Sequence, residues 1–402
     1  MLFKKRPSWI SQDRWLRIMR QRDRRKIWRR QAVRFLKSPK LAAAYFRYRQ
    51  AIDAADWPRV KKYALAVTEQ AVKIRDRQTI GEMTLALERV GCYRESARLW
   101  LSEIARTKSA PNEWRGEDLS GKILLINLYQ PDVYGMGVGY RCAHVVAKLI
   151  GRARRTMAVV EPRQVPTYRR TFPALEIFTS LDDVPKDEVD FVALHEYLLA
   201  EFDLKQPSAG ENFSPLLPNP EKTAQLRKKY LAMSSGGKPL VGLSWYSGHH
   251  GKDLPPLVDW RDFIARTDAT FVSLQYGNIA GDLDILGRDR IIVDESIDQL
   301  VDMDSFCAQV AAMDGTISII STLTNVSAAL GVPAVVLRDD WFRRNLPVLS
   351  DRVPWYPTLR VAGKDGRAWA PVLDESFSKL RALIAERSPA SIDPGTSAAM
   401  RD

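Results

Sequence analysis

The stretch Thr316–Leu337, TISIISTLTNVSAALGVPAVVL, decides the fold that this sequence predicts. Its two ends, Thr316–Ile320 and Ala334–Leu337, are short apolar runs rich in β-branched residues. Runs of this kind, without polar alternation, are typical of strands buried on both faces of a parallel sheet. A hydroxyl-rich turn and a short helical segment join them, so the stretch predicts a strand–helix–strand unit of an α/β protein.

The turn between this first strand and the helix concentrates small polar side chains, Ser321, Thr322, Thr324 and Asn325. The first turn of a helix presents free backbone N–H groups and the positive end of its dipole, which together favour an anion. N-capping alone explains one Ser or Thr, but hardly four hydroxyl or amide residues in five positions. The turn therefore predicts a diphosphate site, with plain capping as the alternative interpretation.

Apolar runs of the same kind precede this unit in two groups. One group holds Lys122–Leu128, Thr156–Val160, Glu176–Phe178 and Asp190–Leu194, and the other holds Leu240–Trp245, Ala269–Leu274 and Arg290–Val293. A polar connector with a predicted helix over Asn219–Leu231 separates the two groups. The pattern predicts two Rossmann-like halves, over residues 121–232 and 238–386, with a cleft between them.

A glycine loop follows the first predicted strand, with Gly135, Gly137 and Gly139 ahead of a predicted helix over Tyr140–Ile150. A loop in this position could cradle a ligand. Its spacing is not GxGxxG, and no acidic residue ends the next strand, so a dinucleotide site is not indicated.

Residues 38–108 show no strand alternation and predict helices. Two short turns that carry an aromatic residue, at Trp57 and Tyr93, lie 36 residues apart. This spacing is close to the period of tetratricopeptide repeats, and the region resembles two degenerate repeats of that family. A plain helical bundle is the alternative. The polar segment 109–120, with Pro and Gly, predicts a domain boundary.

The net charge of +13 is concentrated at one end of the chain, because residues 1–37 alone carry +12. The rest is nearly neutral, which makes nucleic acid an improbable general partner. This basic arm interleaves Trp9, Trp15 and Trp28 with its cations, a pattern that suits an anionic membrane surface or an acidic partner. A solvated arm without a partner is the other interpretation.

The three cysteines, Cys92, Cys142 and Cys307, are scattered over the 402 residues. They form neither a disulfide framework nor a metal knuckle, and they fit a reducing cytoplasm. No apolar run approaches the length of a transmembrane helix. We therefore expect a cytoplasmic protein, peripheral on the inner face of the cytoplasmic membrane if its arm binds lipid, with a flexible tail over 387–402.

From about Gly121 to Val372 the sequence resembles the metal-independent, two-Rossmann (GT-B) glycosyltransferase module of bacterial tetratricopeptide-repeat proteins. That module is related to heptosyltransferases and, more distantly, to protein O-linked N-acetylglucosamine transferases. The residues that carry the resemblance are Val241–Trp245, Phe271–Gln275, the Ile317–Pro333 segment and Pro354–Pro357. The resemblance implies transfer of a sugar from a nucleotide-sugar donor, held by the second half, to a hydroxyl of a surface glycan, a lipid-linked precursor or a protein.

The resemblance also implies a donor site without a metal or other cofactor. Its residues would be Ser244, Lys252, Gln275, Ser321, Thr322, Thr324 and Asn325, with the glycine loop on the acceptor side. Lys252 lies near the family's cation that neutralises the leaving diphosphate, a role that a metal-free site requires. An exposed loop lysine and an ordinary strand-end glutamine are the alternatives for Lys252 and Gln275.

Two departures from the family pattern concern catalysis. Val138 stands where the family usually has a candidate base, and Asn325 stands where it usually has His. The substitutes available near the strand ends of the first half are Asp132, His144 and His195, of which His suits proton transfer near neutral pH. The alternative function is a catalytically inactive GT-B protein that acts as a membrane-docked adaptor through its helical repeats.

Overall fold

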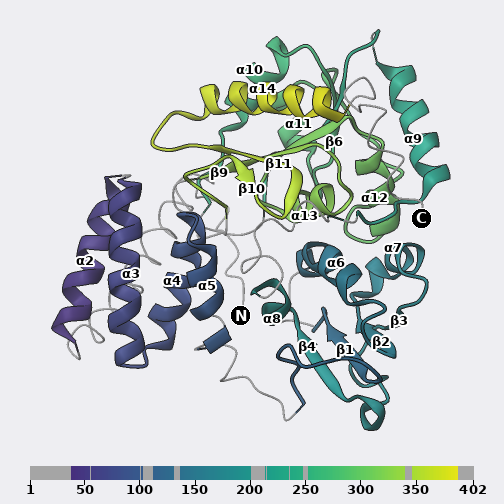
Figure 1. Ribbon diagram of the computed structural model, residues 1–402. Helices are drawn as coiled ribbons and strands as arrows, with labels where there is room; N and C mark the ends of the chain where they lie inside the picture. Colours follow the sequence, from purple (N-terminus) through teal and green to yellow (C-terminus); the bar gives the residue numbers. More distant parts are fainter. Residues whose placement is uncertain are drawn as a thin grey trace, which may run out of the picture.

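The computed structural model describes residues 38–54, 56–99, 101–102, 112–130, 136–200, 213, 215–234, 236–247, 252–339 and 346–387. These residues form a helical array and two α/β halves (Figure 1). The basic arm 1–37, the tail beyond Arg387, Asp132 and Gly135 lie outside the described residues.

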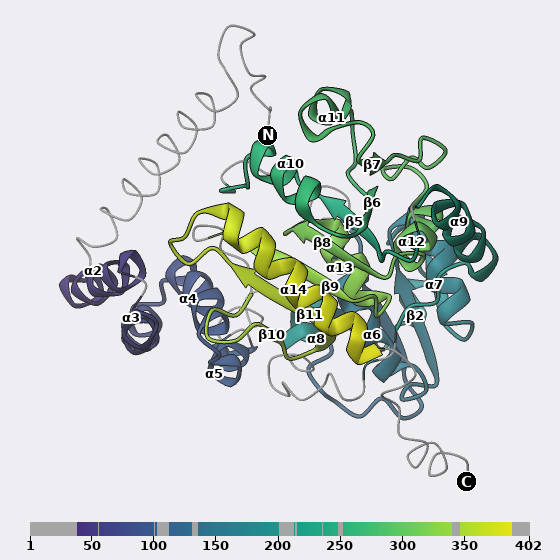
Figure 2. The same ribbon diagram turned by 90° about the horizontal axis from the view of Figure 1, so that it is seen from above.

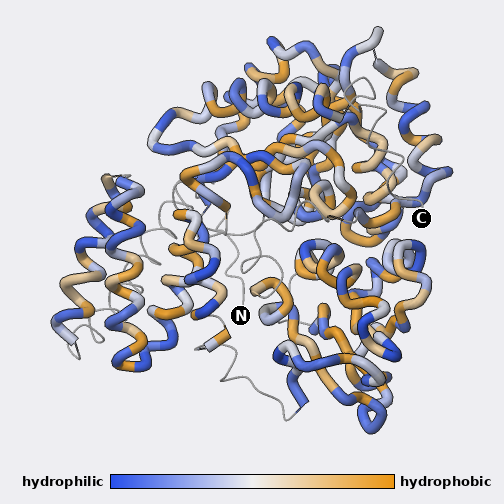
Figure 3. The backbone as a smooth tube through the Cα atoms, viewed as in Figure 1, coloured by the Kyte–Doolittle hydropathy of each residue, from blue (hydrophilic) through white to orange (hydrophobic). Residues whose placement is uncertain are grey.

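The helical array consists of four helices, α2 (Pro39–Asp53), α3 (Trp57–Lys73), α4 (Arg77–Arg89) and α5 (Tyr93–Leu99). The side chains of Ser38, Asp56 and Asp76 cap the first three by accepting a backbone N–H three residues on. Each helix packs on the next, and hydrophobic and hydrophilic residues alternate along α2 and α3 as in amphipathic helices (Figure 3). The two predicted aromatic turns are present, since Trp57 and Tyr93 begin α3 and α5. That these helices are tetratricopeptide repeats stays a prediction.

The first half is a four-stranded parallel sheet in the order β3-β2-β1-β4. Its strands, β1 (Ile123–Asn127), β2 (Arg155–Val159), β3 (Glu176–Phe178) and β4 (Phe191–Leu194), agree with the four predicted runs to within about one residue at each end. The helices around it are α6 (Gly137–Leu149), α7 (Val165–Thr171) and α8 (His195–Leu199), with short 3-10 turns η3 (Pro162–Gln164) and η4 (Lys186–Glu188).

The second half is a seven-stranded sheet in the order β10-β11-β9-β8-β5-β6-β7. Its strands are β5 (Leu240–Ser244), β6 (Thr270–Ser273), β7 (Ile291–Ile292), β8 (Gly315–Ile319), β9 (Ala334–Arg338), β10 (Arg352–Val353) and β11 (Tyr356–Gly363). Only the edge strand β10 is antiparallel. Read from β7, the parallel strands follow the 3-2-1-4-5-6 order of nucleotide-binding α/β folds, which confirms the predicted Rossmann-like architecture.

The helices of the second half are α9 (Pro220–Met233), α10 (Leu257–Arg266), α11 (Ala280–Leu286), α12 (Met303–Ala311), α13 (Thr322–Ala329) and α14 (Trp369–Arg387). Helix α14 lies across β8, β9 and β11, beside α10 (Figure 2). Gly331, with a φ of +68°, follows the end of α13, as the sequence predicted for the residue that ends this helix. No helix of the described segments is long and apolar enough to cross a membrane.

Helix α9 belongs to the second half, although the sequence placed it at the end of the first. The Tyr230 hydroxyl donates to Asp294 at 2.7 Å, and the Arg227 guanidinium donates to Asp314 at 2.8 Å. Both carboxylates lie in the second half, and α9 packs on α12. The boundary between the halves therefore falls before Pro220 and not at residue 232.

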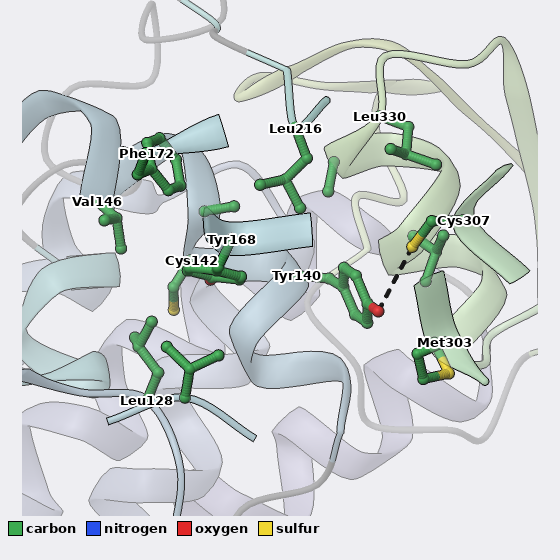
Figure 4. Packing of buried hydrophobic residues seen from close by; sticks show 14 of the residues in the cluster. Leu128, Tyr140, Cys142, Val146, Tyr168, Phe172, Leu216, Met303, Cys307 and Leu330 are labelled. Carbon is green, nitrogen blue, oxygen red and sulfur yellow. Dashed lines mark hydrogen bonds between the residues drawn. The ribbon is translucent and has the colours of Figure 1, made fainter. Parts of the chain in front are cut away.

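The two halves share one hydrophobic core. Figure 4 shows Tyr140 of the first half beside Cys307 of the second, with the Tyr140 hydroxyl 3.5 Å from the Cys307 sulfur, and Tyr168 and Met303 belong to the same cluster. Asp304 on α12 adds polar contacts across the same boundary. It accepts hydrogen bonds of 3.0 and 2.9 Å from the Arg170 guanidinium and one of 2.9 Å from the Thr167 hydroxyl. The halves are therefore joined by both apolar packing and an ion pair.

The helical array packs against the second half next to the same boundary. The Val348 N–H donates to the Arg89 carbonyl at 2.8 Å, and the Tyr93 and Trp355 rings meet edge to face at 5.6 Å. Trp355 also lies under the Arg141 guanidinium of α6, and the Tyr356 hydroxyl donates to the Arg141 carbonyl at 2.9 Å. All three parts of the structure thus meet at Trp355 and Tyr356, which are buried packing residues.

Candidate functional site

The strand order identifies where a ligand would bind in the second half. From β5 the chain first builds the sheet toward β7 and then returns to add β8 on the other side of β5. Ligands of open α/β sheets bind at the carboxyl ends of the strands at such a switch point. The loop after β5, the end of β6 and the hydroxyl-rich turn after β8 meet here, and these segments carry the predicted donor residues.

One side chain of the hydroxyl-rich turn, that of Thr324, forms hydrogen bonds with the backbone of the turn itself. The Thr324 side chain is 7% exposed, and its hydroxyl accepts from the Ser321 N–H at 3.3 Å and donates to the Ile319 carbonyl at 3.1 Å. A contact of 3.1 Å to the Ser318 hydroxyl completes its environment. Thr324 therefore holds β8 to the start of α13, as the capping interpretation expects. Ser321, Thr322 and Asn325 are half-buried. Their role in binding a diphosphate stays a prediction.

Lys252 is not an exposed loop lysine. Its residue is 6% exposed, and its ammonium donates to the Ser247 hydroxyl at 2.7 Å and to the Ile320 carbonyl. Ile320 directly follows β8, so the ammonium is held one residue from the hydroxyl-rich turn. A small pocket opens beside it, lined by Lys252, Asp253, Leu254, Ile319, Ile320, Leu337, Asp339 and Trp369.

The side-chain amide of Gln275 forms hydrogen bonds with the Ser244 hydroxyl and with backbone groups. The Gln275 side chain is 4% exposed, and its Oε1 accepts from the Ser244 hydroxyl at 2.9 Å and from the Trp245 and Tyr246 N–H groups at 3.0 and 2.8 Å. Its Nε2 donates to the Tyr276 carbonyl at 3.1 Å. The structure brings both predicted donor residues to the switch point, where they brace the loop after β5.

Side chains of the protein itself lie against two glycines of the predicted glycine loop, Gly137 and Gly139. A Cβ atom at Gly137 would overlap the Asn325 side-chain amide, and one at Gly139 would overlap the Gln164 side-chain amide. Gln164 is fully buried and donates from Nε2 to the Met136 carbonyl at 2.6 Å. These two glycines therefore allow Asn325 of the second half and Gln164 of the first to reach the start of α6.

Of the three predicted catalytic substitutes, the structure describes His144 and His195, which lie in different surroundings. His144 is 1% exposed and lies within α6, 5.4 Å from the Tyr356 ring and 6.1 Å from the Phe213 ring, which is an aromatic packing position. His195 is half-buried and begins α8 at the carboxyl end of β4, an edge strand of the first sheet. Asp132 lies outside the described residues. Val138 packs partly buried against the shared core.

The Asp-x-Asp pair 282–284 has structural partners. Asp282 accepts from the Trp245 indole N–H at 2.8 Å, and Asp284 pairs with Arg288 at 2.8 Å on the exposed side of α11. Within the ranges that the structure covers, no three His, Cys, Asp or Glu side chains gather as a metal site would require. Metal independence itself stays a prediction.

Sequence reasoning missed Gln164, because a lone glutamine in a loop matches no motif. The spacing of Gly137 and Gly139 indicated that something approaches the backbone closely, but not which group. The sequence also left open whether Lys252 is buried, since the burial of this lysine depends on contacts between distant segments such as Lys252 and Ile320.

Three comparisons place the chain among known proteins. No family model matches it. Protein FlbA of Caulobacter vibrioides is 26% identical over 333 residues, which cover 75% of this chain and 54% of FlbA. The chain therefore spans about half the length of the curated relative that it matches.

Among solved structures, the chain is similar to a glycosyl transferase of family 9 from Veillonella parvula, with a TM-score of 0.45, 11% identity, and coverage of 68% of this chain and 100% of that one. The ADP-heptose lipopolysaccharide heptosyltransferase II of E. coli gives a TM-score of 0.42 at 11% identity, covering 66% and 99% of the two chains. The strand orders of this chain's own two sheets make it a protein of two Rossmann-like halves.

Proposed function

We propose that this protein is a metal-independent glycosyltransferase. Its second half binds a nucleotide-diphosphate sugar, and the sugar passes to a hydroxyl of a glycan, a lipid-linked precursor or a protein held by the first half. The observation that carries the proposal is the buried Lys252 ammonium, fixed by the Ile320 carbonyl beside the N-terminus of α13.

The chemistry explains why this arrangement suits the reaction. When the bond between sugar and diphosphate breaks, negative charge develops on the leaving phosphate. A cation and a helix N-terminus that are already in place stabilise that charge without reorganising. Lys252 and the first turn of α13 would provide both, which is what a site without a metal ion needs.

Activation of the acceptor hydroxyl falls to the first half. His195 lies at the carboxyl end of β4, and an imidazole there would accept the proton of the acceptor as the new bond forms. His144 is less suited, because it packs against the rings of Phe213 and Tyr356.

The proposal is tested by calorimetric titration of UDP, GDP, ADP, CDP and their common sugar conjugates, with and without EDTA. We expect one nucleotide to bind with the same affinity in both conditions. Lys252→Met should weaken that binding about 10- to 150-fold, the equivalent of a charge-assisted hydrogen bond worth roughly 1.5–3 kcal/mol. The matched control is Lys379→Met, on α14 and bonded to the Val361 carbonyl, which should bind as wild type.

Failure of every nucleotide to bind would refute the proposal, and binding that EDTA abolishes and magnesium restores would refute its metal-free form. One observation favours the inactive adaptor as a second candidate, namely the occupation of the start of α6 by Asn325 and Gln164. Nucleotide binding without transfer to any acceptor class would support that alternative.

A further inference from the structure

The loop after β5 carries Lys252 to the switch point, and the structure braces this loop where it begins. Gln275, at the end of the neighbouring strand β6, contacts the three residues with which β5 ends and the loop starts. Its Oε1 accepts from the Ser244 hydroxyl at 2.9 Å, the Trp245 N–H at 3.0 Å and the Tyr246 N–H at 2.8 Å. This one buried oxygen thus accepts three hydrogen bonds at the point where β5 ends and the loop begins.

Only a side-chain amide meets all the demands of this position. The oxygen must accept, while the nitrogen must donate to the Tyr276 carbonyl, which it does at 3.1 Å. Because the Gln275 side chain is 4% exposed, water is poorly placed to replace it. Removing the amide would leave the buried Trp245 N–H without an acceptor, an arrangement that folded proteins rarely tolerate.

The same loop is fixed at its far end. The Asp253 N–H, next to Lys252, donates to the Asp339 carboxylate at 2.7 Å. Lys252 itself ties the loop together through its bond of 2.7 Å to the Ser247 hydroxyl. Gln275 holds the residues where the loop begins, and Asp339 holds the residue after Lys252. The ammonium itself is fixed by its bonds to the Ser247 hydroxyl and the Ile320 carbonyl.

We infer that Gln275 is a positioning residue: it holds the loop that presents Lys252 and does not itself contact the nucleotide. The inference replaces the role that the sequence suggested for Gln275, because the oxygen and one N–H of its amide are engaged within the protein. Its meaning for catalysis rests on the proposed function, since a preorganised cation stabilises the charge on a leaving phosphate better than a mobile one. That Gln275 holds the start of the loop is a property of the free protein, and it can be tested without a nucleotide.

The first experiment is hydrogen exchange of backbone amides in the free full-length protein. Gln275→Met keeps the length of the side chain but removes its hydrogen bonds. We expect the Trp245 and Tyr246 amides to exchange at least about tenfold faster in this variant, as for the loss of one hydrogen bond of ordinary strength. Amides within β5 serve as the internal reference, so a general loss of stability is separated from a local one.

Two further variants sharpen the result. Gln275→Glu keeps an acceptor oxygen but loses the donor to the Tyr276 carbonyl, so both amides should exchange more slowly than in Gln275→Met and faster than in the wild type. Gln309→Met is the matched control, because Gln309 is another fully buried glutamine, bonded through its Nε2 to the Tyr230 hydroxyl on the far side of α12. It should leave the Trp245 and Tyr246 amides unchanged.

The second experiment repeats the nucleotide titration with Gln275→Met, for which we expect at least tenfold weaker binding of the nucleotide that binds the wild type. Unchanged exchange at Trp245 and Tyr246 would overturn the inference, and so would faster exchange with unchanged nucleotide affinity. If the wild type binds no nucleotide, the proposed function fails, while the exchange data still decide whether Gln275 holds the loop.

Discussion

Thr322 and Thr324 stand two positions apart in one turn, yet their surroundings give them opposite roles. The Thr324 hydroxyl is engaged with the Ser321 N–H and the Ile319 carbonyl, whereas Thr322 is the half-buried first residue of α13. Sequence alone treats the two as equivalent donors to a diphosphate. The difference arises because residue three of a helix can reach back to the cap and residue one cannot.

The two threonines therefore make a matched pair of substitutions to valine. Thr324→Val should lower the free energy of unfolding by about 1–3 kcal/mol, because the buried Thr324 side chain loses its hydrogen bonds to the Ser321 N–H and the Ile319 carbonyl. Thr322→Val should leave stability nearly unchanged and weaken binding of a nucleoside diphosphate, since it removes a donor at the helix N-terminus. Chemical denaturation and calorimetric titration give the two quantities.

Thr322→Asp extends the comparison. It should weaken nucleoside-diphosphate binding more than valine does, because it sets a negative charge against the phosphates, and it should keep the fold, because an acid at a helix N-terminus is favourable. An aspartate variant that binds the nucleotide as well as the wild type would reduce the turn to a helix cap.

At the scale of whole elements, the sequence predicted most of the sheets but not all of them. Continuous apolar runs such as Leu240–Trp245 have few alternatives to a buried strand, and they appear as β5 and its neighbours. Strand β11 was missed because Pro357 argues against a strand. The structure accommodates this proline ahead of Leu359, where pairing with β9 begins, so its missing N–H costs no bond to that strand.

Helix α9 was assigned to the wrong half for a related reason. Its sequence is mostly polar, and its two buried residues, Leu226 and Tyr230, do not indicate which half covers them. The partners that decide its place, Asp294 and Asp314, lie 64 and 87 residues further along the chain from the tyrosine and arginine that contact them. Contacts at such separations leave no local signal in the sequence.

The attachment of α9 predicts a pH dependence. Burial alone would raise the pKa of Asp294, but hydrogen bonds from Lys229, Ser296 and Tyr230 outweigh it and lower the pKa to about 2. A folded-state pKa below the ordinary value of about 3.9 means that the stabilisation is complete above about pH 4 and is lost as the pH falls toward 2.

We therefore expect the free energy of unfolding to fall more steeply between pH 4 and 2.5 in the wild type than in Asp294→Asn. Taking the difference between the two proteins removes the contribution of the other carboxylates. Parallel curves for the two proteins over this range would show that Asp294 does not titrate as its contacts require.

For the molecule as a whole, the shared core predicts that the two α/β halves unfold together. Scanning calorimetry should give a single transition for them. Asp304→Ala should lower its midpoint, because it leaves Arg170 and Thr167 without their partner across the boundary. The control is Asp374→Ala, which breaks an exposed pair with Arg266 inside the second half and should change little. Two resolved transitions for the halves would contradict a common core.

For the basic arm, as for the other segments outside the described residues, the sequence is the sole guide. Residues 1–37 lie outside the described residues, so their affinity for an anionic membrane or an acidic partner stays a prediction from charge and tryptophan content.

The common core also limits how such a chain can change by recombination. A second half acquired from another protein, with a different nucleotide preference, would arrive without side chains that fit Tyr140 and Tyr168. Its α12 would need an acid at the place of Asp304 and small apolar residues around Cys307. Under the proposed function, donor specificity would therefore change more readily by point substitutions around the switch point than by the exchange of a complete half.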